Sequence, residues 1–188
     1  MTASLLLICG ATRMEVSKIK DPILRAALDY WLNARGDSDI PLRSHIDPVT
    51  MPPEILPYLV LAEYLNPEGR VRFRLVGGKM EERWGHNFSG QTSDEIFSGS
   101  YREFLESLFE TAYSSRIPVY SESVFRWDAG GFQRTERIMM PICFEIDGPP
   151  TQVLIVQNWP DDGQWDIKPT KSLISGEGQH KSSVLDLA

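Results

Sequence analysis

Three polar residues in one irregular stretch of the chain carry side chains that could catalyse a proton transfer. Arg43, His45 and Asp47 follow one another at every second position in a segment rich in Pro, Asp and Ser. An imidazole beside a carboxylate and a guanidinium could deprotonate and polarise a substrate. Arg43 and Asp47 could instead fasten the loop to the domain through charge-assisted hydrogen bonds, with His45 incidental, and we favour this structural interpretation. The alternative is a small enzyme of the cyclase or isomerase type, with His45 and Asp47 or His86 as its general base.

A second pair of charged residues, Glu136 and Arg137, lies in a run with strand character. Neighbours in a strand face opposite sides of a sheet, so Glu136 shares a face with Arg134, and Arg137 shares the other face with Met139 and Cys143. If that second face is the concave one, Arg137 is a cation in an apolar pocket. It could then bind the carboxylate of a ligand in bidentate fashion.

Charge and residue spacing disfavour several other kinds of site. The 188 residues carry 19 Lys and Arg against 26 Asp and Glu, a formal charge of −7, which disfavours nucleic-acid binding. We predict no metal site, because the three histidines are far apart and none has ligand spacing. The two cysteines, Cys9 and Cys143, are unlikely partners at that separation, which suits a reducing, cytoplasmic compartment. The apolar runs fall short of the roughly 20 residues that a membrane helix needs, so we expect no membrane span.

Two segments have the marks of amphipathic helices. In residues 21–35, Asp21 can cap, Pro22 suits the first helical position and Gly36 suits the exit, while apolar residues recur at helical spacing. Residues 101–115 follow a sequence that matches a capping box, Ser100 to Glu103, and run until Pro118 forbids continuation. We expect one helix on each face of a sheet.

The strands are predicted from short apolar or alternating runs between turn sequences. Residues 59–65 and 71–77 form a hairpin, and residues 119–127, 132–144 and 151–159 form an antiparallel meander. Residues 153–156 are apolar without alternation, which indicates a central strand covered on both faces. If the first helix covers only part of the outer sheet face, the apolar residues left exposed there would form a large patch. Such a patch would favour a homodimer formed through that helix.

The ends of the chain differ from the middle in composition. We predict a flexible segment over residues 1–20, one domain over residues 21–159 and a polar, largely disordered tail over residues 160–188. Residues 5–9 resemble the apolar part of a lipoprotein signal, but no Lys or Arg precedes them. A start at Met14 explains this segment equally well.

The element order, helix, hairpin, short helical segment, long helix and three-strand meander, resembles that of PAS sensor domains. A more specific resemblance is to a small bacterial PAS-type family of short single-domain proteins, formerly a domain of unknown function. The residues that carry this resemblance are Trp31, Arg35-Gly36, Pro41, Arg43, Asp47-Pro48, Leu56-Pro57, Phe73-Arg74-Leu75-Val76-Gly77, Gly85, Gly90, Pro118, Glu136-Arg137 and Pro141. The resemblance implies an α+β fold with a five-stranded antiparallel sheet, a long helix on its concave face and an N-terminal helix on the other.

The same resemblance implies a non-enzymatic sensory or regulatory module with a pocket between the long helix and the sheet. The residues that we expect to contact a small-molecule ligand there are Arg137, Trp84, Phe104, Leu108, Met139 and Arg74. No cofactor can be assigned: the long helix lacks the His of a haem-binding PAS domain, and the loop motif of flavin photosensors is missing. Cys143 is expected to pack in the core. Because no output domain follows the predicted domain, the signal would pass to a partner protein such as a histidine kinase.

Overall fold

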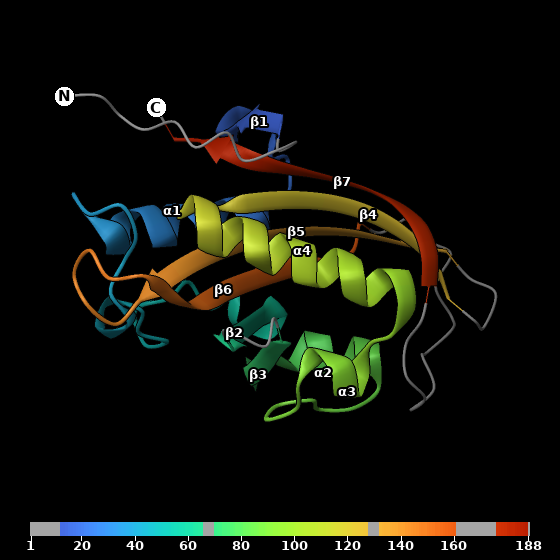
Figure 1. Ribbon diagram of the computed structural model, residues 1–188. Helices are drawn as coiled ribbons and strands as arrows, with labels where there is room; N and C mark the ends of the chain where they lie inside the picture. Colours follow the sequence, from blue (N-terminus) through green and yellow to red (C-terminus); the bar gives the residue numbers. More distant parts are fainter. Residues whose placement is uncertain (1–11, 66–69, 128–131, 161–175, 188) are drawn as a thin grey trace.

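A seven-stranded sheet forms the centre of the protein, in a computed structural model that describes residues 12–65, 70–127, 132–160 and 176–187 (Figure 1). Its strand order is β1-β7-β4-β5-β6-β2-β3. The strands are β1 (Thr12–Glu15), β2 (Leu59–Leu65), β3 (Arg70–Val76), β4 (Val119–Trp127), β5 (Phe132–Cys143), β6 (Pro150–Asn158) and β7 (Gly176–Asp186). The helices are α1 (Pro22–Arg35), α2 (Gly78–Trp84), α3 (Ser93–Ile96) and α4 (Gly99–Ser115), with short 3-10 turns at Val16–Lys18, Arg43–His45 and Leu56–Tyr58.

Helix α1 begins and ends where the sequence predicts. The Asp21 carboxylate accepts hydrogen bonds from the backbone N–H groups of Ile23 and Leu24, both at 2.9 Å, and Gly36 leaves the helix at a φ of 56°. The buried stripe of α1 includes Trp31, whose indole N–H donates to the carbonyl of Pro141 on β5 at 2.9 Å. This face packs on one side of the sheet, as predicted.

Helix α4 covers the opposite side of the sheet (Figure 1). Its buried stripe is Tyr101, Phe104, Leu105, Leu108, Phe109 and Ala112, and it ends at Arg116, which takes the left-handed conformation. The prediction of a capping box at its start was wrong. Ser98 occupies the N-cap position without a side-chain hydrogen bond, and the capping box belongs to Thr92 and Glu95 at the start of α3. Both sequences fit the motif, and only the backbone path distinguishes them.

The hairpin and the meander agree with the sequence prediction to within a residue or two at their ends. Strands β2 and β3 pair antiparallel, and β4, β5 and β6 pair antiparallel in chain order. Strand β6 also pairs with β2, which places it inside the sheet with buried residues on both faces. These five strands are the sheet that the resemblance to PAS domains implies.

Two further strands come from the segments expected to lack structure. Strand β7 belongs to the predicted disordered tail, yet it pairs with β4 from Val184 opposite Val119 to Gly176 opposite Trp127. Strand β1 lies parallel to β7 at the edge. Strand β7 is held mainly by backbone hydrogen bonds and contributes few buried apolar residues, here Val184 and Leu185, so its polar sequence gave no strand signal. The lipoprotein-like residues 5–9 lie outside the described residues.

The core consists of two clusters separated by the sheet. One lies between the sheet and α2, α3 and α4, and the other lies under α1 and the connection that follows it, which contributes Ile40, Ile46, Met51 and Ile55. This connection and α1 cover the outer sheet face within one chain. The exposed apolar face that suggested a homodimer is therefore absent from the described part of the chain. In the same part, no helix has both the length and the apolar character needed to cross a membrane.

Candidate ligand site between α4 and the sheet

Three polar side chains form a row across the centre of the sheet, on the face that α4 covers. Arg137 of β5 lies directly opposite Ser121 of β4 and directly opposite Gln157 of β6. Residues paired in this way point to the same face of a sheet. Met139, two positions after Arg137, belongs to the core cluster under α4, which identifies that face. All three polar residues are buried, with exposed fractions of 0% for Ser121 and Arg137 and 4% for Gln157.

Arg137 makes few contacts for a buried guanidinium. Its Nη2 donates to the hydroxyl oxygens of Ser123 and Tyr101 at 3.3 and 3.4 Å. Its Cζ lies 5.5 Å from the centre of the Phe104 ring and 5.9 Å from that of Tyr101, within the range of cation–π attraction. Its Nε and Nη1 have no hydrogen-bond partner, and among the described residues it forms no ion pair.

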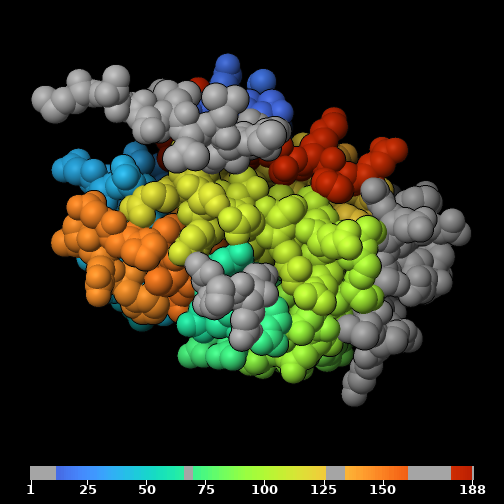
Figure 2. Space-filling model, viewed as in Figure 1, coloured from blue at the N-terminus to red at the C-terminus, as the bar shows by residue number. Residues whose placement is uncertain are grey.

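A small cavity adjoins this cation. Its volume is about 30 Å³, and its walls are mostly apolar and aromatic: Val60, Phe73, Met80, Trp84, Phe88, Phe97, Tyr101, Leu105, Phe109, Met139 and Ile155, with Arg137 and Gln157 as the charged and amide members. The aromatic rings contact one another edge to face, as Phe97 does with Trp84 and Tyr101. Figure 2 shows side chains of α4 and of the segment before it packed side by side over this part of the molecule. The cavity is thus lined by α2, by α4, by residues on either side of α3, and by the strands β2, β3, β5 and β6.

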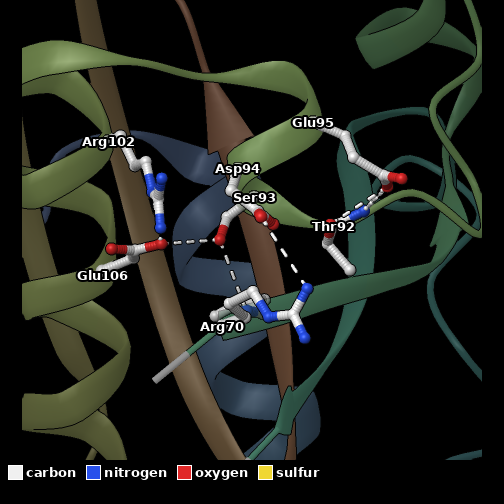
Figure 3. Close-up of polar contacts among 8 residues, drawn as sticks. Arg70, Thr92, Ser93, Asp94, Glu95, Arg102 and Glu106 are labelled. Atoms are coloured by element: carbon white, nitrogen blue, oxygen red, sulfur yellow. Dashed lines mark hydrogen bonds and ion pairs between the residues drawn. The ribbon is translucent and has the colours of Figure 1, made fainter. Parts of the chain in front are cut away.

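The charged groups between β3, α3 and α4 behave differently (Figure 3). There Arg102 forms an ion pair with Glu106 at 2.9 Å, and Arg70 lies 3.8 Å from Asp94. A hydrogen bond from the Thr92 side chain, assisted by the two arginines, lowers the pKa of Asp94. Each cation in this cluster faces an anion, so the cluster fastens α3 to its neighbours and offers no uncompensated charge to a ligand. Arg137 differs from these cations, because among the described residues it forms no ion pair.

The residues predicted to contact a ligand fall into two groups. Trp84 and Met139 line the cavity, Phe104 faces Arg137, and Leu108 is buried in the same core cluster. Arg74 does not belong with them, because its side chain is half exposed and lies 3.9 Å from Glu63. Strand alternation explains the difference, since the neighbouring Phe73 points into the cavity.

Cys143 does not share the face of Arg137, contrary to the sequence prediction. The pairing of β5 with β6 shifts register between Ile142 and Cys143, and this bulge turns Cys143 to the α1 side. There it is buried next to the carbonyl oxygens of Ile40 and Pro41, and burial raises the pKa of its thiol. The prediction that Cys143 packs in the core is confirmed.

The candidate catalytic loop lies on the α1 side of the sheet, away from the cavity. Arg43 donates to the carbonyl of Ile46 at 2.8 Å, and a ring nitrogen of His45 lies 3.1 Å from the carbonyl of Ala34. The backbone N–H of Asp47 donates to the Tyr30 hydroxyl at 2.8 Å. His45 and the backbone of Asp47 therefore fasten the loop to α1, whereas the side chains of Arg43 and Asp47 bond within the loop. The expected anchoring by charged side chains, with His45 incidental, is not the arrangement found.

The other two histidines lie nearer to the cavity without lining it. His86 is half buried, and its Nδ1 lies 3.1 Å from the carbonyl of Trp84. His180 of β7 is exposed, and its ring centre lies 4.1 Å from that of Phe104. Among the described residues, no group of three His, Cys, Asp or Glu side chains could hold a metal ion.

Sequence reasoning missed Ser121, Gln157 and Tyr101 as members of the site. Tyr101 could be read only as part of an apolar helical stripe. A signal for the serines existed, because Ser121 and Ser123 alternate with larger residues between Val119 and Phe125 and so share one face of a strand. Gln157 follows directly on the apolar run of β6, and only the strand register places it opposite Arg137.

A sheet that is antiparallel except for β1, with one long helix on one face and α1 on the other, defines an α+β protein. Comparison with family models agrees, because residues 19–150 match the model described as PAS domain. The chain belongs to this PAS domain family. Its sheet contains the five expected strands and two more, β1 and β7. No curated protein matches the chain.

Proposed function

We propose that this protein is a non-enzymatic PAS-type sensory module that binds a small ligand in the cavity between α4 and the sheet. The observation that carries the proposal is the cavity with Arg137 and Gln157 in its wall. Burial of polar groups without partners costs folding free energy, and such groups are expected where a ligand supplies the missing contacts.

The size of the cavity suggests how binding of a ligand would change the surface of the protein. A volume of about 30 Å³ fits only a few atoms, so a larger ligand displaces part of the wall. Helix α2 contributes Met80 and Trp84 to that wall, and the wall residues Phe88 and Phe97 lie on either side of the short helix α3. Exposed residues such as Glu81 and Glu95 lie on these two helices. Movement of these helices would alter a surface that a partner protein, such as a histidine kinase, could recognise.

The placement of the candidate general bases supports a role without catalysis. His45 and Asp47 are engaged with α1 on the far side of the sheet, and His86 points a ring nitrogen to the backbone of Trp84. A general base must lie within hydrogen-bond reach of the proton that it removes. We therefore assign these side chains to the support of their loops.

The test is native mass spectrometry beside the denatured mass of the same purified protein. We expect an additional mass in the native spectrum that denaturation releases. Val60→Ile adds one methylene group to the cavity wall and should reduce the retained mass, whereas Val49→Ile adds the same group at a site that is 89% exposed and should leave it unchanged. Equal native and denatured masses, before and after incubation with small organic acids, would contradict the proposal.

A further inference from the structure

We propose that the row of Ser121, Arg137 and Gln157 is a site for a small monovalent anion, either a halide or the carboxylate group of a small organic acid. This inference rests on the proposed function, because it names the chemical class of ligand that the cavity takes. It assigns Arg137 as the countercharge and Gln157 as a second donor to the same anion.

The charge of Arg137 is the first argument. A guanidinium group stays protonated in proteins and carries five N–H donors. At Arg137 only Nη2 is engaged, by hydroxyl oxygens at 3.3 and 3.4 Å, whereas charge-assisted hydrogen bonds to carboxylates are about 2.7–2.9 Å long. Neither hydroxyl oxygen carries a formal negative charge. The guanidinium is fully buried, so solvent does not compensate its charge either.

The second argument is the set of donors around the cavity. Besides Nε and Nη1 of Arg137, the amide Nε2 of Gln157 is buried without a hydrogen-bond partner. Gln157 and Arg137 both line the cavity and lie opposite each other on neighbouring strands. The lining includes no Asp or Glu. A site with several free donors, one positive charge and no negative charge favours an anion.

The hydroxyl of Ser121 completes the row on the other side of Arg137. Its Oγ is also buried without a partner, and Ser121 lies opposite Arg137 on β4. A serine hydroxyl can donate to an anion or orient a guanidinium by rotation alone. Because Ser121 is not part of the cavity wall, we assign it to positioning of Arg137.

The volume of the cavity limits the size of the anion. A single water needs roughly 10–15 Å³ of such space, so about 30 Å³ holds one monatomic ion or a carboxylate group of a few atoms. A single cation in the site matches a single negative charge. A water molecule would satisfy the N–H donors and leave the charge uncompensated, so we expect the anion to be the stronger ligand.

The experiment compares thermal unfolding of the full chain in sodium salts at constant ionic strength. Sulfate, a divalent anion outside the proposed class, serves as the reference, and the test anions are chloride, bromide, formate, acetate and benzoate. For the wild type we expect the melting temperature to rise and saturate with at least one test anion. Arg137→Met should abolish the saturable rise, and Gln157→Leu should weaken the affinity about tenfold, the effect of one hydrogen bond to a charged group.

Arg134→Met is the matched control, because Arg134 lies on the same strand, is exposed and pairs with Glu136 at 3.2 Å. Its anion response should equal that of the wild type. Arg137→Lys keeps the charge and should retain the response. If Arg137→Met does not fold, Gln157→Leu is the decisive variant, because it removes a proposed donor to the anion and leaves the charge of Arg137 in place. A response limited to the smallest anions assigns an inorganic ion, and a stronger response to acetate or benzoate assigns the head group of an organic acid.

An anion response that is identical in the wild type, Arg137→Met and Gln157→Leu would overturn the inference. So would the absence of any saturable response in the wild type. A protein that retains an uncharged molecule in its native mass spectrum and shows no such response keeps the proposed sensory function and loses the anion site. The two failures are therefore distinguishable.

Discussion

Replacement of Arg137 by Met should stabilise the protein in buffer without small anions. Most substitutions of fully buried residues destabilise, so the sign of this effect is diagnostic. Methionine has a long, unbranched side chain that can occupy much of the same space without a charge. The expected gain arises because the wild type holds a guanidinium in its core without a counter-ion among the described residues.

The contacts of Arg137 allow an estimate of that gain. A buried charge without its partner costs about 3–5 kcal/mol. The two cation–π contacts offset roughly 1–2 kcal/mol together, and the long hydrogen bonds to Ser123 and Tyr101 offset roughly 1 kcal/mol. The net expectation is an increase of about 0–3 kcal/mol in the free energy of unfolding, or up to about 12 °C in melting temperature.

The assay is chemical and thermal unfolding of wild type, Arg137→Met and Arg134→Met, with sulfate as the only added anion. Arg134→Met should stay within about 0.5 kcal/mol of the wild type, because its ion pair is exposed. Saturation of the wild type with a bound anion should shrink the advantage of Arg137→Met. A clear loss of stability in Arg137→Met without anions would refute the reasoning, since it would mean that the guanidinium is already compensated.

Four further substitutions test other parts of the structure. Gly77→Ala should destabilise, because its Cβ would lie 2.5 Å from two backbone oxygens, whereas Gly78→Ala meets nothing within 4 Å and should be neutral or stabilising; denaturant titration of both compares them. Burial and the hydrogen bond to Glu110 raise the pKa of Tyr64 to about 12 from 10.0, so its contribution to stability is complete below pH 10 and is lost as the pH rises through 12. Tyr64→Phe should remove that alkaline loss, and an unchanged profile would exclude the effect. Leu185→Ala should cost about 2–5 kcal/mol if β7 is part of the folded domain, and a change under 0.5 kcal/mol would show that β7 is dispensable.

Much of the fold follows from local sequence signals. The cap of α1 and the apolar stripes of both long helices depend on spacings that the sequence contains. The turn sequences between the meander strands likewise mark where each strand ends. Strand β7 escaped prediction because its pairing with β4 depends on backbone contacts between segments far apart in the chain.

The site was predictable only in part, for a related reason. Alternation along one strand predicted that Arg137 and Met139 share a face, and the structure confirms this. Alternation also predicted that Cys143 joins them, which was wrong because a bulge shifts the end of β5. That Ser121 and Gln157 flank Arg137 depends on the register between strands, which no single strand specifies.

A crystal grown or soaked in bromide, measured at the bromine absorption edge, tests the central claim most directly. We expect an anomalous peak in the cavity under α4, within hydrogen-bond reach of Arg137 Nε or Nη1 and of Gln157 Nε2, and the loss of that peak in Arg137→Met. A cavity that holds only water or stays empty in the wild type, while bromide occupies surface sites elsewhere, would contradict the account.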